Sequence, residues 1–227
     1  MQTEIFEYPL TKYNFTEIIS SYLNTDDLSK LKAEPLENSS HPLEGSSIYK
    51  NMEETKTYKQ LYEILNSERG KVFYETYEKF IKEIIRPQYD EPIYYQAKPT
   101  NRILYKNSPG QSRFHKDKQY GHHEAEINYM VPQTEATGTN SLWIESQENK
   151  KDFTALNMSP GEFARFKGVD LMHGAKVNSE NKTRVSFDFR VIPESQWPGD
   201  PVDTTNWKQK DKENFLFKNA HNFAYCP

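Results

Sequence analysis

The residues of this chain with the clearest chemical potential lie in Ser112–Asp117, which reads Ser-Arg-Phe-His-Lys-Asp. If this stretch is a β-strand, His115 and Asp117 project from the same face, because side chains alternate along a strand with a period of two. One imidazole and one carboxylate on one face supply two of the three ligands of a 2-His-1-carboxylate iron site. His173, in the segment Leu-Met-His-Gly, is the candidate for the third ligand.

A second group of polar residues lies on one face of the segment Thr183–Ile192. Apolar residues alternate there with Arg184, Ser186, Asp188 and Arg190. If the apolar face packs beneath helices, the polar face lines a cavity, where such groups cost free energy unless they are paired or bind something. Arg184 with Ser186 is a suitable receptor for a carboxylate, because a guanidinium forms bidentate, charge-assisted hydrogen bonds with a carboxylate and the hydroxyl adds a further donor. The alternative is an exposed strand whose polar side faces water.

Two helical patterns in the N-terminal part are expected to cover the sheet that carries these residues. Asn14 opens the first, with Glu17 three residues later as in a capping box, and an apolar stripe follows at helical spacing. The second pattern begins at Tyr58, and Gly70 either divides it into two helices or weakens one. Between the patterns, residues 34–55 are rich in Pro, Ser, Asn, Gly and charge, which predicts a long surface loop or a lid.

After the second helical pattern, short alternating segments bounded by turn signals take over. Eight segments at this spacing indicate a β-sandwich or barrel, and a jelly roll with helices on one outer face is the simplest architecture. We expect a single domain with a mainly helical N-terminal part (1–90), a β core (91–193) and a wrapping C-terminal tail (194–227). The predicted strands are Ile93–Ala97, Arg102–Lys106, Ser112–Asp117, Ile127–Val131, Asn140–Glu145, Glu162–Lys167, Leu171–Val177 and Thr183–Ile192.

Composition narrows the classes of partner and the cellular location. With 29 basic and 33 acidic residues, the formal net charge of −4 gives no electrostatic case for nucleic-acid or anionic-membrane binding. The sequence has no run of about 18 apolar residues, which a membrane-spanning helix needs, and its acidic N-terminus has no apolar signal region. The single cysteine, Cys226, cannot form an internal disulfide. We therefore expect a protein of the reducing cytoplasm.

Taken together, His115-x-Asp117, the later His173 and Arg184-x-Ser186 resemble the non-haem Fe(II)/2-oxoglutarate-dependent dioxygenases. The longer sequence around these motifs is similar to the sequences of the subgroup found in antibiotic gene clusters, including the cluster for streptomycin biosynthesis. The resemblance covers under half of the chain and implies a double-stranded β-helix (jelly-roll, cupin-like) core. It further implies that the two histidines and Asp117 hold Fe(II), and that Arg184, helped by Ser186, binds the distal carboxylate of 2-oxoglutarate.

The reaction implied by the resemblance consumes O2 and 2-oxoglutarate, releases succinate and CO2, and hydroxylates a small-molecule substrate. Halogenases of this superfamily lack the carboxylate ligand, so the presence of Asp117 disfavours halogenation. Desaturation and ring formation are alternatives that the motif does not distinguish from hydroxylation. The polarity of the expected pocket suits a polar, zwitterionic or glycosidic substrate, such as an amino acid, an amino sugar or an antibiotic intermediate.

Other polar residues near these motifs are candidates for contact with cosubstrate or substrate. Asn128 is a candidate donor to 2-oxoglutarate, with an internal hydrogen bond as the alternative. Arg113 is expected to share the inward face of the metal-binding strand, whereas Arg190 either binds substrate or pairs within the barrel. His122 and His123 could compete as metal ligands, although a substrate or supporting role suits either of them better. The candidates for substrate binding are Arg113, Tyr120, His122, Asn140, Trp143 and Arg190.

Two other functions remain alternatives to the hydroxylase. One is a cupin-like metal- or sugar-binding protein without redox turnover, which would use His115, His122 and His123. That function predicts that ligand binding does not depend on Arg184. The other alternative is a non-catalytic scaffold of the same fold.

Overall fold

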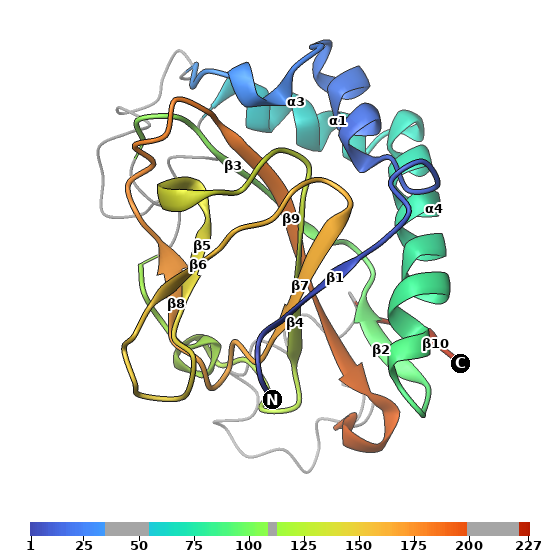
Figure 1. Cartoon of the computed structure of the whole chain (residues 1–227). Coiled ribbons are helices and arrows are strands. Elements are labelled where there is room, and N and C mark those ends of the chain that lie inside the picture. Colours follow the sequence, from blue (N-terminus) through green and yellow to red (C-terminus); the bar gives the residue numbers. More distant parts are fainter. Residues whose placement is uncertain (35–54, 109–112, 199–222) are drawn as a thin grey trace.

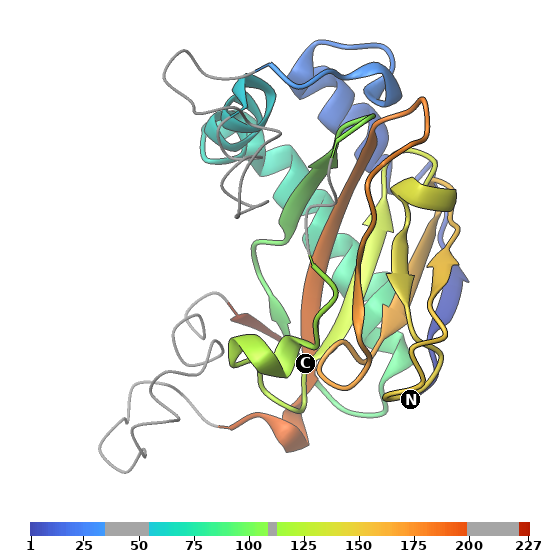
Figure 2. The same ribbon diagram turned by 90° about the vertical axis from the view of Figure 1, so that its left-hand side faces the viewer.

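The computed structural model describes residues 1–34, 55–108, 113–198 and 223–227. These residues form a larger and a smaller β-sheet that face each other, with helices covering the outer face of the larger sheet (Figures 1 and 2). This is the mainly β architecture with flanking helices that the sequence predicts. The division of the chain into a helical part, a core and a wrapping tail stays a prediction, and the predicted loop of residues 34–55 lies almost wholly outside the described residues.

Strand order places the longest strand near the middle of the larger sheet. That sheet runs β1-β7-β4-β9-β2-β10, and β3 also pairs with β9. The smaller sheet runs β6-β5-β8. The strands are β1 (Glu4–Glu7), β2 (Ile93–Gln96), β3 (Thr100–Leu104), β4 (Ile127–Pro132), β5 (Leu142–Ile144), β6 (Thr154–Leu156), β7 (Glu162–Phe166), β8 (His173–Ala175), β9 (Arg184–Pro193) and β10 (Phe223–Cys226).

The helices begin and divide where local sequence signals place them. α1 (Phe15–Leu23) is capped by Asn14, whose side chain accepts a hydrogen bond from the backbone N–H of Glu17 at 3.1 Å. α3 (Lys56–Leu65) and α4 (Lys71–Phe80) are separate helices. Gly70 lies at their junction, where a Cβ atom would come within 2.2 Å of the carbonyl oxygen of Leu65. Of the two alternatives that the sequence left open for Gly70, the structure shows the division into two helices.

The apolar face of β9 packs against aromatic side chains of the helices. Val185, Phe187, Phe189 and Val191 are all fully buried. The ring of Phe187 meets that of Phe15 in α1 edge to face, at 4.9 Å between centroids, an arrangement that aromatic pairs favour. Because side chains alternate along a strand, this packing turns the polar residues of β9 toward the smaller sheet.

Two features of the β structure differ from the sequence prediction. The predicted strand Ser112–Asp117 is wrong: His115 forms an isolated β-bridge with His173, and Asp117 begins a 3₁₀ turn. The short strands β1, β6 and β10 were not predicted. β1 and β10 are held by pairing with β7 and β2, from which they are distant in sequence, and their own residues carry little periodic signal.

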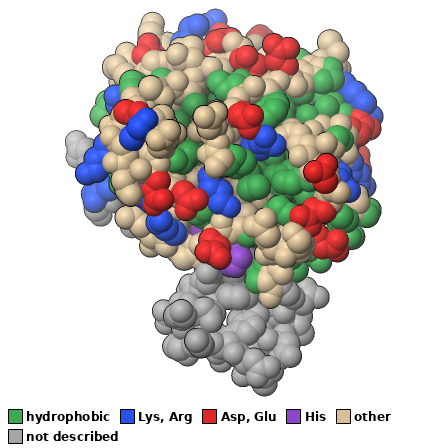
Figure 3. Space-filling model, turned by 60° about the horizontal axis from the view of Figure 1, so that its bottom comes forward, with side chains coloured by type: hydrophobic (Ala, Val, Ile, Leu, Met, Phe, Trp, Pro, Cys, Tyr) green, Lys and Arg blue, Asp and Glu red, His purple; other side chains and the backbone are tan. Residues whose placement is uncertain are grey.

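The described helices and one face of the surface bear on the expectations from composition. Among the described residues, none of the helices combines the length and the apolar character that crossing a bilayer requires. On the face shown in Figure 3, acidic and basic side chains are interspersed rather than gathered by sign.

Candidate metal centre

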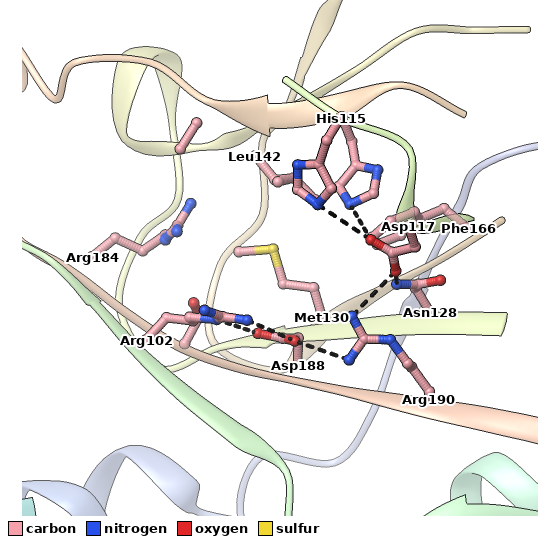
Figure 4. Close-up of a pocket in the computed structure, with 13 residues that line it drawn as sticks. Arg102, His115, Asp117, Asn128, Met130, Leu142, Phe166, Arg184, Asp188 and Arg190 are labelled. Carbon is pink, nitrogen blue, oxygen red and sulfur yellow. Dashed lines mark hydrogen bonds and ion pairs between the residues drawn. The ribbon is translucent and has the colours of Figure 1, made fainter. Parts of the chain in front are cut away.

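A cavity of about 70 Å³ lies between the two sheets, and the polar face of β9 forms one side of it. Arg184, Ser186, Asp188 and Arg190 all line this cavity. Figure 4 shows the metal-ligand candidates at one end and Arg184 at the other, with Met130 between them. The volume has room for roughly five to seven water molecules at about 10–15 Å³ each, which suits one small organic acid.

Three potential metal ligands converge at one end of the cavity. Nε2 of His115 and Nε2 of His173 lie 3.2 and 3.4 Å from Oδ1 of Asp117, and the ligand atoms all lie within 4.8 Å of one another. Nδ1 of His115 lies 2.6 Å from the carbonyl oxygen of Arg113, and Nδ1 of His173 lies 2.9 Å from that of Leu171. Since a carbonyl only accepts, each Nδ1 donates, which leaves each Nε2 lone pair directed at the centre.

A close backbone approach brings the two histidines together. The N–H of His115 donates to the carbonyl of His173 at 2.9 Å, and the reverse bond has the same length. Gly174 permits this approach, because a Cβ atom there would lie 2.9 Å from the backbone of Phe114. In the segment Leu-Met-His-Gly, the histidine is therefore the candidate metal ligand, and the glycine is needed for the close backbone packing.

Hydrogen bonds to Asp117 give its two carboxylate oxygens different roles. Oδ2 accepts from Nδ2 of Asn128 at 2.7 Å and from a terminal nitrogen of Arg190 at 3.1 Å. Oδ1 faces the histidines. Although burial acts to raise the pKa of Asp117, the nearby charge of Arg190 holds that pKa well below its usual value. Asp117 is therefore an ionised ligand oriented to bind a cation through one oxygen.

The partners of Asp117 are themselves held in place. Oδ1 of Asn128 accepts from the N–H of Gly168 at 3.1 Å. Arg190 is buried, and its Nε lies 3.2 Å from Oε2 of Glu126, a carboxylate with no exposed surface. Oε2 of Glu126 also lies 2.6 Å from Nδ1 of His122. A buried network of hydrogen bonds and ion pairs thus holds the partners of Asp117, and through them Asp117 itself, in place.

The opposite end of the cavity is built differently. Arg184 is only 4 % exposed, and one terminal nitrogen donates to the carbonyl of Asn140 at 2.8 Å. Its Nε has no hydrogen-bond partner, and no carboxylate of the described residues lies within ion-pair distance. Burial, together with the nearby charge of Arg102, lowers the pKa of Arg184 to about 10, so the guanidinium stays protonated at neutral pH. A buried cation without a counter-ion is costly, and this end of the cavity is suited to an anion.

The two ends together fit the groups that a 2-His-1-carboxylate centre uses. His115, Asp117 and His173 would hold a metal ion such as Fe(II), because two imidazoles and one carboxylate are a ligand set that this metal uses. At the other end, the guanidinium of Arg184 and the buried hydroxyl of Ser186 lie on the same face of β9 and are suited to a carboxylate.

Of the two candidates next to the predicted metal strand, Arg113 does not lie as the sequence suggested, and Tyr120 lies beside a metal-ligand candidate. The expected inward position of Arg113 is wrong, because the stretch is not a strand: the side chain is exposed and lies outside the cavity lining. Tyr120 is 62 % exposed, and its ring meets that of His115 edge to face at 5.0 Å. A substrate-binding role for Tyr120 stays a prediction.

Four other candidates have structural partners. Asn128 and Arg190 line the cavity but bind Asp117, so the structure favours the internal hydrogen bonds that the sequence left as the alternative. Asn140 accepts a hydrogen bond from the N–H of Thr137, and Nε1 of Trp143 donates to a carbonyl oxygen. The lining includes neither Asn140, nor Trp143, nor His122.

The sequence analysis missed Arg102, Glu126 and Gly168. Arg102 lines the cavity from β3, where it lies opposite Ser186. Glu126 and Gly168 hold Arg190 and Asn128. Each of these roles depends on a contact between segments distant in sequence, for which the chain carries no local signal.

Comparison with known proteins gives one relative in sequence and several in structure. No family model matches. The chain is 27% identical over 190 residues to the streptomycin biosynthesis protein StrG of Streptomyces griseus, covering 84% of each protein. It superposes on the structure of EctD from S. alaskensis with bound Fe with a TM-score of 0.51, at 13% identity and covering 86% of this chain and 74% of that one. For CytC3 with Fe(II) and alpha-ketoglutarate the TM-score is 0.46, at 16% identity, covering 88% and 75%. The protein therefore has the double-stranded β-helix fold of the non-haem Fe(II)/2-oxoglutarate oxygenases, carries a buried His-Asp-His triad, and is a homologue of StrG.

Proposed function

We propose that this protein is an Fe(II)/2-oxoglutarate-dependent oxygenase that hydroxylates a small polar metabolite. One observation carries the proposal: a three-ligand metal centre and a buried guanidinium without a carboxylate partner among the described residues share one small cavity. A metal-binding protein without 2-oxoglutarate has no use for the second feature. The cost of burying Arg184 is understandable if a dicarboxylic acid completes the site.

Residues at the two ends of the cavity would bind different groups. His115, Asp117 and His173 would hold Fe(II), while Arg184 and Ser186 would hold the distal carboxylate of 2-oxoglutarate. When bound, iron and 2-oxoglutarate supply the oxidant from O2, and the cosubstrate leaves as succinate and CO2. The apolar side chains of Met130, Leu142 and Phe166 line the cavity and would keep water away from the reacting groups.

The substrate class is supported by the relative in sequence and by the form of the site. StrG is named for streptomycin biosynthesis, which supports a polar substrate such as an amino sugar or another antibiotic intermediate. The cavity itself has room for little more than the cosubstrate, so the substrate would approach from outside it. The exposed ring of Tyr120 beside His115 offers one surface for that approach.

Anaerobic addition of Fe(II) and 2-oxoglutarate tests the proposal. We expect a weak visible charge-transfer band that is absent in His173→Ala and retained in His123→Ala, a matched variant outside the triad. The cupin-like alternative uses His123 and not Arg184, so it expects the opposite: loss of metal in His123→Ala and unchanged ligand binding in Arg184→Ala. Absence of the band from the intact protein would contradict the proposal. With the band established, a substrate screen would follow succinate release and the mass of the product.

A further inference from the structure

Arg102 lies at the arginine end of the cavity because of the register between β3 and β9. In this antiparallel pair Arg102 is directly opposite Ser186, with Leu104 opposite Arg184 and Thr100 opposite Asp188. Directly opposite side chains share a face of the sheet, with Cβ atoms about 4.5–5.5 Å apart, and long side chains also reach the diagonal neighbours. Arg102 is therefore within reach of both Arg184 and Asp188 and enters the cavity beside Ser186.

In this structure Arg102 pairs with Asp188. Its Nε lies 2.7 Å from Oδ1 of Asp188, and a terminal nitrogen lies 3.4 Å from Oδ2. The side chains of this pair are 15 % and 21 % exposed, whereas Arg184 and Ser186 are almost completely buried. The pair is therefore the part of the arginine end that an entering anion can reach first.

The charges at this end are unevenly shared. Asp188 forms ion pairs with two guanidiniums. Besides its pair with Arg102, its Oδ2 lies 3.8 Å from a terminal nitrogen of Arg190. No oxygen of Asp188 lies within ion-pair distance of Arg184. Arg102, in contrast, is close enough for its charge to lower the pKa of Arg184. Among the residues that line this end of the cavity, two guanidiniums, Arg102 and Arg184, face one carboxylate, Asp188, which leaves an excess of positive charge.

We propose that Arg102 is a further binding residue for the distal carboxylate of 2-oxoglutarate, and that Asp188 holds Arg102 until the cosubstrate arrives. This inference rests on the proposed function. A carboxylate has about four acceptor sites on its two oxygens, enough for the fork of Arg184, the hydroxyl of Ser186 and one nitrogen of Arg102. Asp188 and the cosubstrate then compete for Arg102, so Asp188 weakens cosubstrate binding while it neutralises Arg102 in the empty site.

A purely structural role for Arg102 and Asp188 predicts a different result for the two substitutions. If Arg102 and Asp188 only tie β3 to β9, removing either partner breaks the same contact and has a similar consequence. If Arg102 binds the cosubstrate, the two partners have opposite effects. Arg102→Met removes a donor to 2-oxoglutarate, whereas Asp188→Asn keeps the shape of the side chain and releases Arg102 from its competitor.

The experiment is an anaerobic titration of each Fe(II)-loaded protein with 2-oxoglutarate, followed by the charge-transfer band and by equilibrium dialysis. We expect Arg102→Met to raise the Kd about 10- to 100-fold, the usual effect of losing a hydrogen bond between charged groups. Asp188→Asn should leave the Kd unchanged or lower it. A Kd for Arg102→Met at least about 10 times that for Asp188→Asn supports the inference, and a smaller ratio overturns it.

Two controls keep this result separate from folding and from the proposed function. 2-Oxopentanoate has the same carbon chain without the distal carboxylate, so its binding should change by less than about threefold in Arg102→Met; an equal loss for both ligands overturns the inference. Arg102→Gln replaces Arg102→Met if the latter does not bind Fe(II). If the wild-type protein binds Fe(II) but not 2-oxoglutarate, the proposed function itself fails, whatever the variants do.

Discussion

Arg184 and Arg190 lie on the same face of the same strand, β9, at the two ends of the cavity, yet the polar groups at these ends are satisfied to very different degrees. At the metal end, Oδ2 of Asp117 has two donors, and Arg190 lies within 4 Å of carboxylate oxygens of Asp117, Glu126 and Asp188. At the other end, Arg184 has one hydrogen bond to a carbonyl and an unpartnered Nε.

This difference separates what the protein must hold rigid from what it leaves to a ligand. A metal centre needs its ligands fixed by surrounding hydrogen bonds before the ion arrives. A cosubstrate site that must bind and release in every cycle can leave a charge uncompensated, because the ligand supplies the partner. The same type of residue therefore serves as a structural cation at one position of β9 and as an open binding group six residues earlier.

The largest expected effect comes from breaking the metal end with Arg190→Met. This substitution leaves the buried carboxylates of Asp117 and Glu126 without the cation that they share. Removing one partner of a buried ion pair costs about 3–5 kcal/mol, so the metal-free protein should lose that much unfolding free energy. Urea denaturation with chelator present measures it.

Restoring charge balance provides the control for Arg190→Met. The double variant Arg190→Met/Glu126→Gln removes the carboxylate that has no metal to neutralise it, and should regain part of the lost stability. A single variant as stable as the wild type would show that the network does not support the metal end.

The next effect is on metal affinity and comes from Gly174→Ala. The added Cβ would lie 2.9 Å from the backbone of Phe114, so the segments carrying His115 and His173 must separate. All three ligands remain in the sequence, but their convergence is lost, and we expect Co(II) affinity to fall by about 10- to 100-fold. Competition with a chromogenic chelator measures this, and wild-type affinity in Gly174→Ala would contradict the close-approach argument.

A smaller effect should follow from Gly168→Ala, because the clash is with a side chain that can move. A Cβ there would lie 2.8 Å from the amide of Asn128, which would displace that amide from Oδ2 of Asp117. We expect metal affinity to fall by less than about 10-fold. If the effect passes through Asn128, the double variant Gly168→Ala/Asn128→Ala will bind metal no more weakly than Asn128→Ala alone.

The contrast between the two ends also explains how much the sequence could predict. His115, Asp117 and His173 are recognisable by residue type and order, and the alternation of β9 places Arg184 and Ser186 on one inward face. These signals are local or depend only on order along the chain. They predict correctly that the groups meet in one cavity of a double-stranded β-helix.

The supporting contacts could not be predicted because they depend on tertiary register. Arg102 reaches the cavity because β3 pairs with β9 in one register, and no residue near Arg102 encodes that register. Asp117 leaves the strand geometry expected of it because its N–H donates to the carbonyl of Gly168 rather than to a neighbouring strand. Its ligand role survives this change, since coordination needs a converging oxygen and not a particular secondary structure.

The smallest expected effect on stability comes from Arg184→Met, which is also the sharpest comparison with Arg190→Met. Both substitutions replace a buried arginine on the same face of β9 with an apolar side chain of similar length. Arg184 loses only a hydrogen bond to the carbonyl of Asn140, worth about 1 kcal/mol, and the variant avoids burying an uncompensated charge. We therefore expect the unfolding free energy without 2-oxoglutarate to stay within about 1 kcal/mol of the wild type or to rise.

Adding 2-oxoglutarate to the Fe(II)-loaded proteins under anaerobic conditions should reverse this order for Arg184→Met. The wild type gains stability in proportion to the logarithm of ligand concentration over Kd, and the variant, which lacks the main carboxylate receptor, should gain almost none. Thermal unfolding with and without 2-oxoglutarate measures both parts. If Arg184→Met is destabilised as much as Arg190→Met without ligand, then Arg184 is a structural cation too, and the two ends of the cavity do not differ in the way their hydrogen bonds indicate.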